Sequence, residues 1–243
     1  MLHGLGFQAL ATTSAGMAFA AGRREGSVPF DAVLAHCAEI VAASPLPVSA
    51  DLECGLGHTA EDAAETIRVA ARTGIAGCSL EDHTGDPQNP IYEFGLAVER
   101  IAAAAEAAKA QPNDLVFTAR CENFLWERPD LDDTIRRLQA YEAAGADVLY
   151  APGLRDIATI RTVCDSLTNP VNVIMGFPGE NLSVDALSGA GVARISVGSA
   201  FARRAYGAFI EAAREIADQG RFDTTGDAMG FADIERLLPE AGS

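Results

Sequence analysis

The chain has 243 residues, and 49% of them are hydrophobic, which is typical of a folded globular core rather than a disordered segment. Its net charge of −16 argues against nucleic-acid binding, because phosphate contacts need clustered Lys and Arg side chains. The chain has no apolar run near the ~20 residues of a membrane span, and its start lacks a secretory signal, so we expect a cytoplasmic protein without nucleic-acid or membrane partners.

Short β-branched runs alternate with longer amphipathic stretches, a pattern typical of βαβ units and a parallel sheet. Helices are predicted at 59–73, 93–110, 131–144 and 200–219, several of them closed by a glycine that leads directly into the next strand. The predicted strands are residues 9–13, 47–52, 77–81, 115–120, 147–151, 171–175 and 194–198.

Repetition of one helix–glycine–strand unit favours a closed barrel over an open doubly wound sheet, which remains the alternative. The predicted fold class is therefore α/β, a (β/α)8 barrel of the TIM type that occupies residues 1–243 as one domain. A closed barrel of this kind needs eight strands, and the sequence predicts seven. We therefore expect that the first strand is lacking in this chain, that the missing segment lies upstream, and that residues 1–7 are the tail of a first helix.

Residue content limits the chemistry. The five cysteines are widely spaced without a CxxC pair, which indicates reduced thiols and no zinc site. Lys109 is the only lysine, and it lies in an Ala-rich helical stretch rather than at a strand end. Schiff-base chemistry needs a lysine amine in a desolvated site, so we do not expect a mechanism of that kind. Metal-dependent or acid–base catalysis is the remaining possibility.

Acidic residues follow two neighbouring predicted strands. Asp51 and Glu53 are two positions apart, so both point to one face, and Glu81 ends the adjacent strand. Three converging carboxylates repel one another unless a cation lies between them or protons are retained. Mg²⁺, or Mn²⁺ in its place, is the expected cofactor, because hard cations prefer oxygen ligands. The alternative is that these acidic side chains are merely solvated.

A guanidinium and a small-residue turn complement these carboxylates. Arg120 ends the next strand and offers a planar fork of donors to a carboxylate or phosphate, although a structural salt bridge with Glu122 or Glu81 is the alternative. The turn Ser14-Ala15-Gly16 follows the first predicted strand and offers a hydroxyl and backbone N–H groups to an anion.

The ordered set of motifs resembles the isocitrate lyase/phosphoenolpyruvate mutase superfamily, in its carboxyphosphonoenolpyruvate mutase-like branch. The most specific motif is similar to the family pattern D-x-[DE]-x-G-x-G, and two further motifs follow at family spacing. The three motifs are Asp51-Leu52-Glu53-Cys54-Gly55-Leu56-Gly57, Leu80-Glu81-Asp82 and Ala119-Arg120-Cys121-Glu122.

The resemblance implies roles for individual residues. Glu53 would be the main carboxylate of the metal site, with Asp51 and Glu81 beside it, mostly through water. The substrate carboxylate would be bound by Ser14, Ala15, Gly16, Arg120 and Asn123. Arg120, His83 and Glu122 are the predicted catalytic residues, with His83 as the acid–base candidate because histidine titrates near neutral pH. The family also implies a homo-oligomer, a dimer or a tetramer, in which helix 231–238 is exchanged between subunits.

The lid segment departs from the family's better-known members. It lacks the cysteine of the isocitrate lyase type, and His83 stands where phosphoenolpyruvate mutase has a lysine. We therefore predict a Mg²⁺-dependent carbon–carbon lyase or decarboxylase that acts on a small α-keto or α-hydroxy (di)carboxylate through an enolate-like intermediate. Phosphorus–carbon chemistry of the mutase or phosphonopyruvate hydrolase type is one alternative. A catalytically impaired barrel that binds a metabolite is the other.

Overall fold

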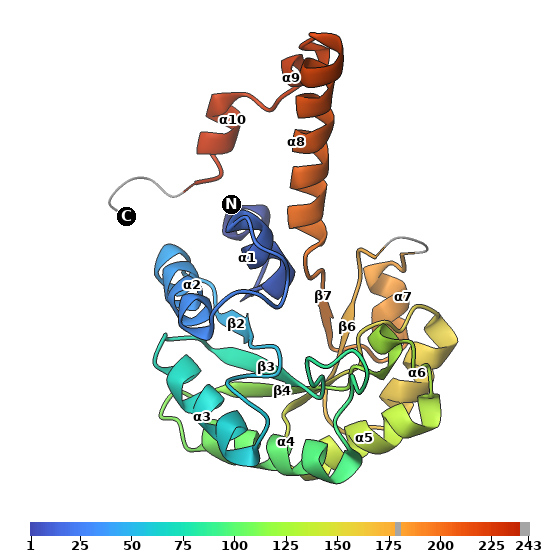
Figure 1. Cartoon of the computed structure of the whole chain (residues 1–243). Coiled ribbons are helices and arrows are strands. Elements are labelled where there is room, and N and C mark those ends of the chain that lie inside the picture. Colours follow the sequence, from blue (N-terminus) through green and yellow to red (C-terminus); the bar gives the residue numbers. More distant parts are fainter. Residues whose placement is uncertain (178–180, 239–243) are drawn as a thin grey trace.

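The computed structural model describes residues 1–177 and 181–238 (Figure 1). At its centre is one sheet of parallel strands whose spatial order follows the chain. Each strand lies within a predicted one and is shorter than or equal to it. The strands are β1 (Leu10–Ala11), β2 (Val48–Asp51), β3 (Gly77–Glu81), β4 (Val116–Arg120), β5 (Val148–Tyr150), β6 (Val171–Ile174) and β7 (Arg194–Ser196).

The sheet curls into a nearly closed barrel with helices on its outer side, which confirms the predicted TIM-type fold (Figure 1). Every neighbouring pair of strands is parallel. Within the described residues β7 is not paired with β1, so the barrel is open between these two strands. The number of strands in the described part of the chain, seven, agrees with the sequence prediction.

The four predicted helices correspond to α3, α4, α5 and α8, and the predicted helix tail at the N-terminus is a single 3₁₀ turn, η1. The predicted helix 231–238 contains α10. The sequence did not predict α1, α2, η2, α6, α7 and α9. The bounds are η1 (His3–Leu5), α1 (Ser14–Ala20), α2 (Phe30–Ala43), α3 (Ala60–Ala71), α4 (Phe94–Lys109), η2 (Asn123–Trp126), α5 (Leu131–Ala143), α6 (Ile157–Asp165), α7 (Val184–Gly189), α8 (Ala200–Gln219), α9 (Asp223–Gly226) and α10 (Phe231–Glu235).

Local sequence signals set where helices begin and end. Thr59 caps α3 in a reciprocal capping box: its Oγ1 accepts from the Asp62 N–H at 3.1 Å, and Asp62 Oδ2 accepts from the Thr59 N–H at 2.9 Å. Gly74 and Gly145 follow α3 and α5 with φ values of 84° and 105°, a region that strongly favours glycine. Each helix therefore turns at once into the next strand, and the carboxyl ends of the strands meet at one rim.

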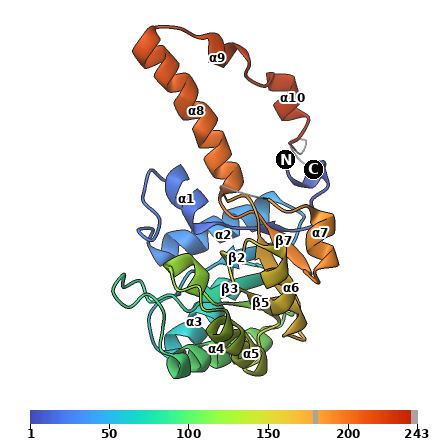
Figure 2. The same cartoon turned by 90° about the vertical axis from the view of Figure 1, so that its right-hand side faces the viewer.

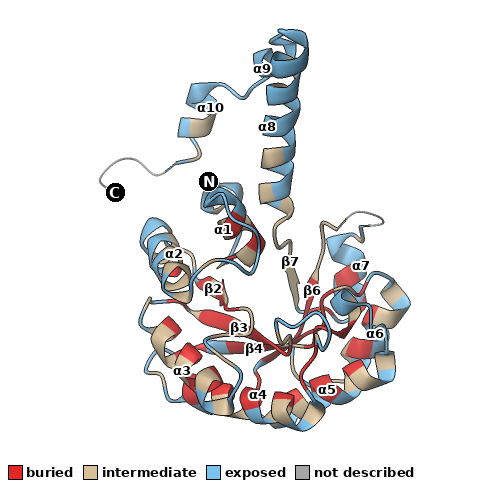
Figure 3. Cartoon of the chain, viewed as in Figure 1, coloured by how far each residue is buried: buried red, intermediate tan, exposed pale blue. Residues whose placement is uncertain are grey.

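The last three helices form an arm, in which α8 extends away from the barrel and the chain returns through α9 and α10 toward the N-terminus (Figures 1 and 2). No residue of α8 is buried, in contrast to the strands and the inner helix faces, which form the core (Figure 3). Phe209 and Phe231 are 68% and 88% exposed. The arm thus carries an apolar surface that nothing in the described part of this chain covers.

Within residues 1–177 and 181–238, none of the helices has both the length and the apolar character that a membrane span requires.

Candidate active site

The predicted site residues gather at the carboxyl ends of three adjacent strands. Asp51 ends β2, Glu81 ends β3 and Arg120 ends β4. The register pairs Glu81 directly with Arg120, and Asp51 with Ser79 two residues earlier on β3. The parallel sheet therefore brings these side chains to the same rim, which is where β/α barrels carry their active sites.

Arg120 is the centre of the cluster. Its Nη1 lies 2.9 Å from Asp51 Oδ1, and its Nη2 lies 3.0 Å from Glu81 Oε2 and 2.8 Å from Glu122 Oε1. Its guanidinium carbon is 5.2 Å from the centre of the Tyr150 ring. Burial alone would lower the pKa of Arg120, but the three carboxylates raise it well above its usual value. The salt bridges with Glu122 and Glu81, which were the alternative role considered for Arg120, are therefore present, and Asp51 is a third partner.

The cluster carries more negative charge than one guanidinium balances. Burial, followed by the charges of Asp51 and Glu25, raises the pKa of Glu53 to about 7, against an opposing effect of Arg120. Burial also raises the pKa of Glu81 well above its usual value; Arg120 opposes this shift, and the charges of Glu122 and Asp51 add to it. A site of this kind favours protons or a cation, since either relieves the repulsion.

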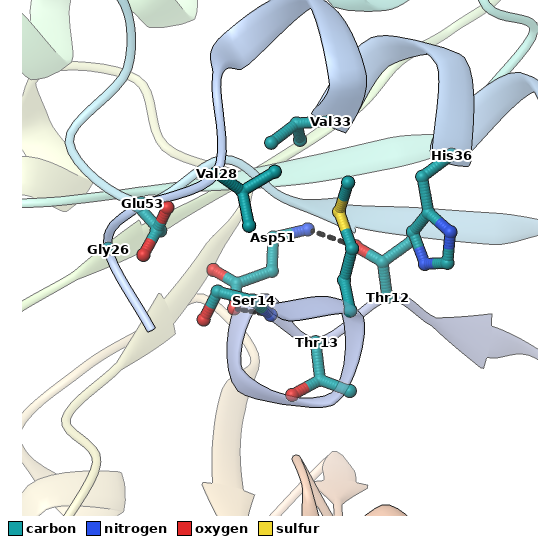
Figure 4. Close-up of a pocket in the computed structure, with 10 residues that line it drawn as sticks. Thr12, Thr13, Ser14, Gly26, Val28, Val33, His36, Asp51 and Glu53 are labelled. Atoms are coloured by element: carbon teal, nitrogen blue, oxygen red, sulfur yellow. Dashed lines mark hydrogen bonds between the residues drawn. The ribbon is translucent and has the colours of Figure 1, made fainter. Parts of the chain in front are cut away.

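A small cavity lies beside Asp51 and Glu53, between β2 and the helices α1 and α2 (Figure 4). Ser14, the first residue of α1, donates its backbone N–H to Asp51 Oδ2 at 3.2 Å, and its Oγ donates to Glu25 Oε1 at 3.1 Å. Ala15 and Gly16 follow in the first turn of α1. The cavity is lined by Thr12, Thr13, Ser14, Met17, Gly26, Val28, Val33, His36, Asp51 and Glu53.

His83 lies at the edge of the cluster, two residues after the end of β3. Its ring stacks on Trp126 with centroids 4.0 Å apart, and its Nδ1 is 3.7 Å from Glu81 Oε1. Burial, and then the charge of Arg120, lower the pKa of His83. Its Nε2 is buried and has no hydrogen-bond partner in the described part of the chain. The lowered pKa favours the neutral form of the imidazole, and its buried Nε2 is free of hydrogen bonds to the described residues.

Asp82 fixes the backbone of Glu122 by a hydrogen bond. Asp82 Oδ1 accepts from the Glu122 N–H at 2.8 Å, and its Oδ2 accepts from the Tyr141 hydroxyl at 2.6 Å and from Arg137 at 3.3 Å. Burial raises the pKa of Asp82, although these donors oppose the shift. The second acidic residue of the Leu80-Glu81-Asp82 motif thus supports the loop after β4.

Asn123 has surroundings different from those of the other site residues. Its Nδ2 donates to Asp133 Oδ2 at 3.0 Å and to Thr134 Oγ1 at 3.2 Å, both at the start of α5. The side chain is buried, and within the described residues its Oδ1 has no partner. These contacts tie the loop after β4 to α5, and the substrate contact of Asn123 stays a prediction.

Two residues of the cluster were not predicted from the sequence. Glu25 contacts Ser14, and its charge acts on Glu53; its only sequence signal is an acidic residue in the turn Arg23-Arg24-Glu25-Gly26. Trp126 covers His83, and a lone tryptophan shortly after a strand-end motif is the corresponding signal. Both contacts depend on loops that meet only in the folded chain.

The residues present fit a hydrated Mg²⁺ ion. Among the residues that the structure describes, no three His, Cys, Asp or Glu side chains are arranged to hold a metal directly. Mg²⁺, however, commonly keeps several waters and binds through one or two carboxylates. Glu53 and Asp51 supply such oxygens beside the cavity, and a divalent ion would offset the charges of Asp51 and Glu25 that add to burial in raising the pKa of Glu53.

A TIM-type barrel with motif residues at three successive strand ends defines a member of the isocitrate lyase/phosphoenolpyruvate mutase superfamily. Residues 1–217 match the family described as phosphoenolpyruvate phosphomutase, and the chain belongs to this family. The predicted resemblance is therefore confirmed.

Three similar proteins illustrate the family. A provisionally assigned lyase/mutase from Burkholderia cenocepacia has a solved structure that is 53% identical, with a TM-score of 0.93, over 97% of this chain and 84% of that one. The 2-methylisocitrate lyase of Escherichia coli is 32% identical over 60% of this chain and 50% of its own length. The oxaloacetate decarboxylase of Bradyrhizobium diazoefficiens is 32% identical over 60% of this chain and 51% of its own length. The chain thus spans about half the length of these two curated relatives.

Proposed function

We propose that the chain is a Mg²⁺-dependent carbon–carbon lyase or decarboxylase for a small α-keto or α-hydroxy (di)carboxylate. The observation that carries the proposal is the convergence of Asp51, Glu81 and Glu122 on Arg120 at the barrel rim, with Glu53 beside them. The two curated relatives, a lyase and a decarboxylase, support the reaction class. The metal, the substrate and the residue roles are part of the proposal.

The chain's own residues supply binding and charge. Mg²⁺ acts as a Lewis acid for the substrate's oxygen atoms when it is bound. Glu53 and Asp51 provide its oxygen ligands, directly or through water. Arg120 presents a fixed positive charge to the substrate carboxylate and to the negative charge that develops as the carbon–carbon bond breaks, an electrostatic effect that is often the largest in catalysis. Ser14, Ala15 and Gly16 face the same carboxylate.

Within this class the structure favours decarboxylation. When the carbon–carbon bond of a β-keto acid breaks, CO₂ leaves without taking up a proton, and the remaining enolate needs one proton at carbon. Cleavage of a hydroxy acid instead needs a base at the hydroxyl and an acid at the new carbanion. His83 is the available acid–base group in the lid, where the lyase-type cysteine is absent. A β-keto dicarboxylate therefore makes the smallest demand on this site.

A substrate panel with Mg²⁺ tests the proposal. We expect Mg²⁺-dependent conversion of oxaloacetate to pyruvate and CO₂, with slower or no cleavage of methylisocitrate and dimethylmalate. Phosphate release from phosphonopyruvate as the main activity would instead establish the phosphorus–carbon alternative. The catalytically impaired barrel would be supported if none of the four compounds is turned over and a keto acid stabilises the folded chain in the presence of Mg²⁺.

We also propose that the arm packs on a second copy of this chain, as the family resemblance implies. The segment 231–238 predicted to be exchanged includes α10 and lies in the arm, which exposes several large apolar side chains. They include Phe201, Phe209, Ile210, Phe222, Met229 and Phe231. Light scattering is expected to give a mass two or four times the 25.4 kDa of the chain. The double change Phe209→Asp and Phe231→Asp should shift the mass to that of one chain, and a monomeric wild type would contradict the proposal.

Cytoplasmic location and the single-domain organisation of residues 1–243 stay predictions.

A further inference from the structure

Arg100, near the middle of α4, is a buried cation that the proposed chemistry does not use. Its side chain faces the loop between β2 and α3 and is only 1% exposed. None of the ion pairs formed by the described part of the chain includes Arg100. A buried guanidinium without a carboxylate partner is costly unless other groups satisfy its donors.

Backbone carbonyl groups satisfy it. Arg100 Nη2 donates to the Cys54 carbonyl at 2.5 Å, and its Nη1 donates to the carbonyls of Gly57 at 2.7 Å and Thr59 at 3.0 Å. The three carbonyls lie within residues 54–59 of the loop that joins β2 to α3. One planar side chain thus fixes the path of the whole loop, which a flexible ammonium group could not do with the same geometry.

The same loop carries Glu53 immediately before the first of these carbonyls. Glu53 has a φ of 50°, in the left-handed region that residues with a Cβ atom seldom adopt. Such a conformation persists only where surrounding contacts hold it. The Glu53 carbonyl accepts from the Glu81 N–H at 3.1 Å on one side, and Arg100 holds the Cys54 carbonyl on the other.

The ring of Tyr92 shields one face of the Arg100 guanidinium. The Tyr92 ring lies 4.6 Å from the guanidinium carbon, and the Tyr92 hydroxyl is 2.6 Å from His58 Nδ1 in the same loop. Tyr92 is itself buried. The loop is therefore tied to α4 through Arg100 and to Tyr92 through His58.

We propose that Arg100 is a positioning residue for the metal carboxylate: its three hydrogen bonds to the carbonyls of Cys54, Gly57 and Thr59 hold Glu53 in its left-handed conformation. Arg100 acts through the loop and touches neither substrate nor ion. The inference rests on the proposed role of Glu53 as a Mg²⁺ ligand.

The test compares Arg100→Lys and Arg100→Met with Ile101→Ala. Ile101 is the next residue of α4 and is also 1% exposed, so its truncation destabilises the helix packing without removing any of the three hydrogen bonds. Mg²⁺ affinity is measured by calorimetry on each folded variant, and amide exchange of the peptide covering residues 52–58 is measured without metal.

We expect Mg²⁺ affinity to fall by ~10–100-fold in both Arg100 variants, as for other groups that orient metal ligands. Amide exchange at Gly55 and Leu56 should become faster. The Ile101→Ala protein should lose thermal stability while it keeps its Mg²⁺ affinity. If Arg100→Met does not fold, Arg100→Lys provides the same readouts.

Unchanged Mg²⁺ affinity in a folded Arg100 variant would overturn the positioning role and leave the proposed function intact. A wild type that binds no Mg²⁺ would remove both. An equal loss of affinity in Ile101→Ala would show a general stability effect and would also overturn the inference.

Discussion

Replacement of Glu53 by Gln is expected to lower turnover by ~10²–10³-fold and to leave the fold intact. The substitution keeps the size of the side chain and removes the charge that would face the cation. Mg²⁺ affinity, measured by calorimetry, should fall by at least ~10-fold. Glu61→Gln is the matched control, because this glutamate is exposed on α3 and pairs only with Arg68 among the described residues. Turnover at the wild-type rate in Glu53→Gln would remove the metal role of Glu53.

The pH dependence gives this variant a second signature. The pKa of Glu53 is raised from its usual 4.5 to about 7 in the folded chain. A group whose folded pKa is raised contributes stability below its unfolded pKa and loses that contribution as pH rises through the folded pKa. Without Mg²⁺, the wild type should therefore lose about 2–3 kcal/mol of stability between pH 4.5 and pH 7, at ~1.4 kcal/mol per pKa unit and with a discount for partial exposure.

Glu53→Gln should flatten this pH dependence, because glutamine does not titrate. Mg²⁺ binds the carboxylate form, so wild-type affinity should rise with pH up to about 7 and then level off. Urea unfolding and Mg²⁺ titration at pH 5, 6, 7 and 8 measure both effects. An identical pH profile for the wild type and the variant would show that Glu53 is not the titrating group.

The second large effect is expected for Arg120→Met. It leaves the carboxylates of Asp51, Glu81 and Glu122 without their shared partner, and the loss of one partner of a buried ion pair typically costs about 3–5 kcal/mol. The loss should be larger at pH 8 than at pH 5, because the carboxylates can take up protons at the lower pH. Turnover should be abolished, since no fixed positive charge then faces the substrate carboxylate.

Two further variants serve as controls for Arg120→Met. Arg120→Lys keeps the charge without the planar fork, so it should retain most of the stability and still lose turnover. Arg68→Met removes an exposed arginine that pairs with Glu61 and Glu65, and it should cost less than ~1 kcal/mol. Wild-type turnover in either Arg120 variant would contradict the proposed mechanism.

The strands were predictable because their signals are local. A β-branched run after a helix-ending glycine, as at Gly74 and Gly145, gives both the position and the direction of the next strand. The six missed helices have weaker signals. The helix α1, for example, begins at the predicted anion-binding turn itself, because Thr13 caps it and accepts a bond from the Gly16 N–H at 3.4 Å.

The candidate site was predictable only in part, for a related reason. Asp51, Glu81 and Arg120 end adjacent strands, so the strand order alone brings them together. Glu25 contacts Ser14, and Arg100 contacts the loop that carries Glu53. The contacts of Arg100 join segments that are far apart in the sequence. A buried arginine inside a predicted helix looks like a surface charge in the sequence, and only the fold shows its three carbonyl partners.

Anomalous diffraction from crystals soaked with Mn²⁺ and oxalate is the most direct test of the claim that strand-end carboxylates and Arg120 enclose a cation and an organic acid. We expect one strong peak beside Glu53 and Asp51, with an oxalate carboxylate on Arg120. A peak on another face of the barrel, with Glu53 unliganded in crystals that contain both compounds, would contradict the account.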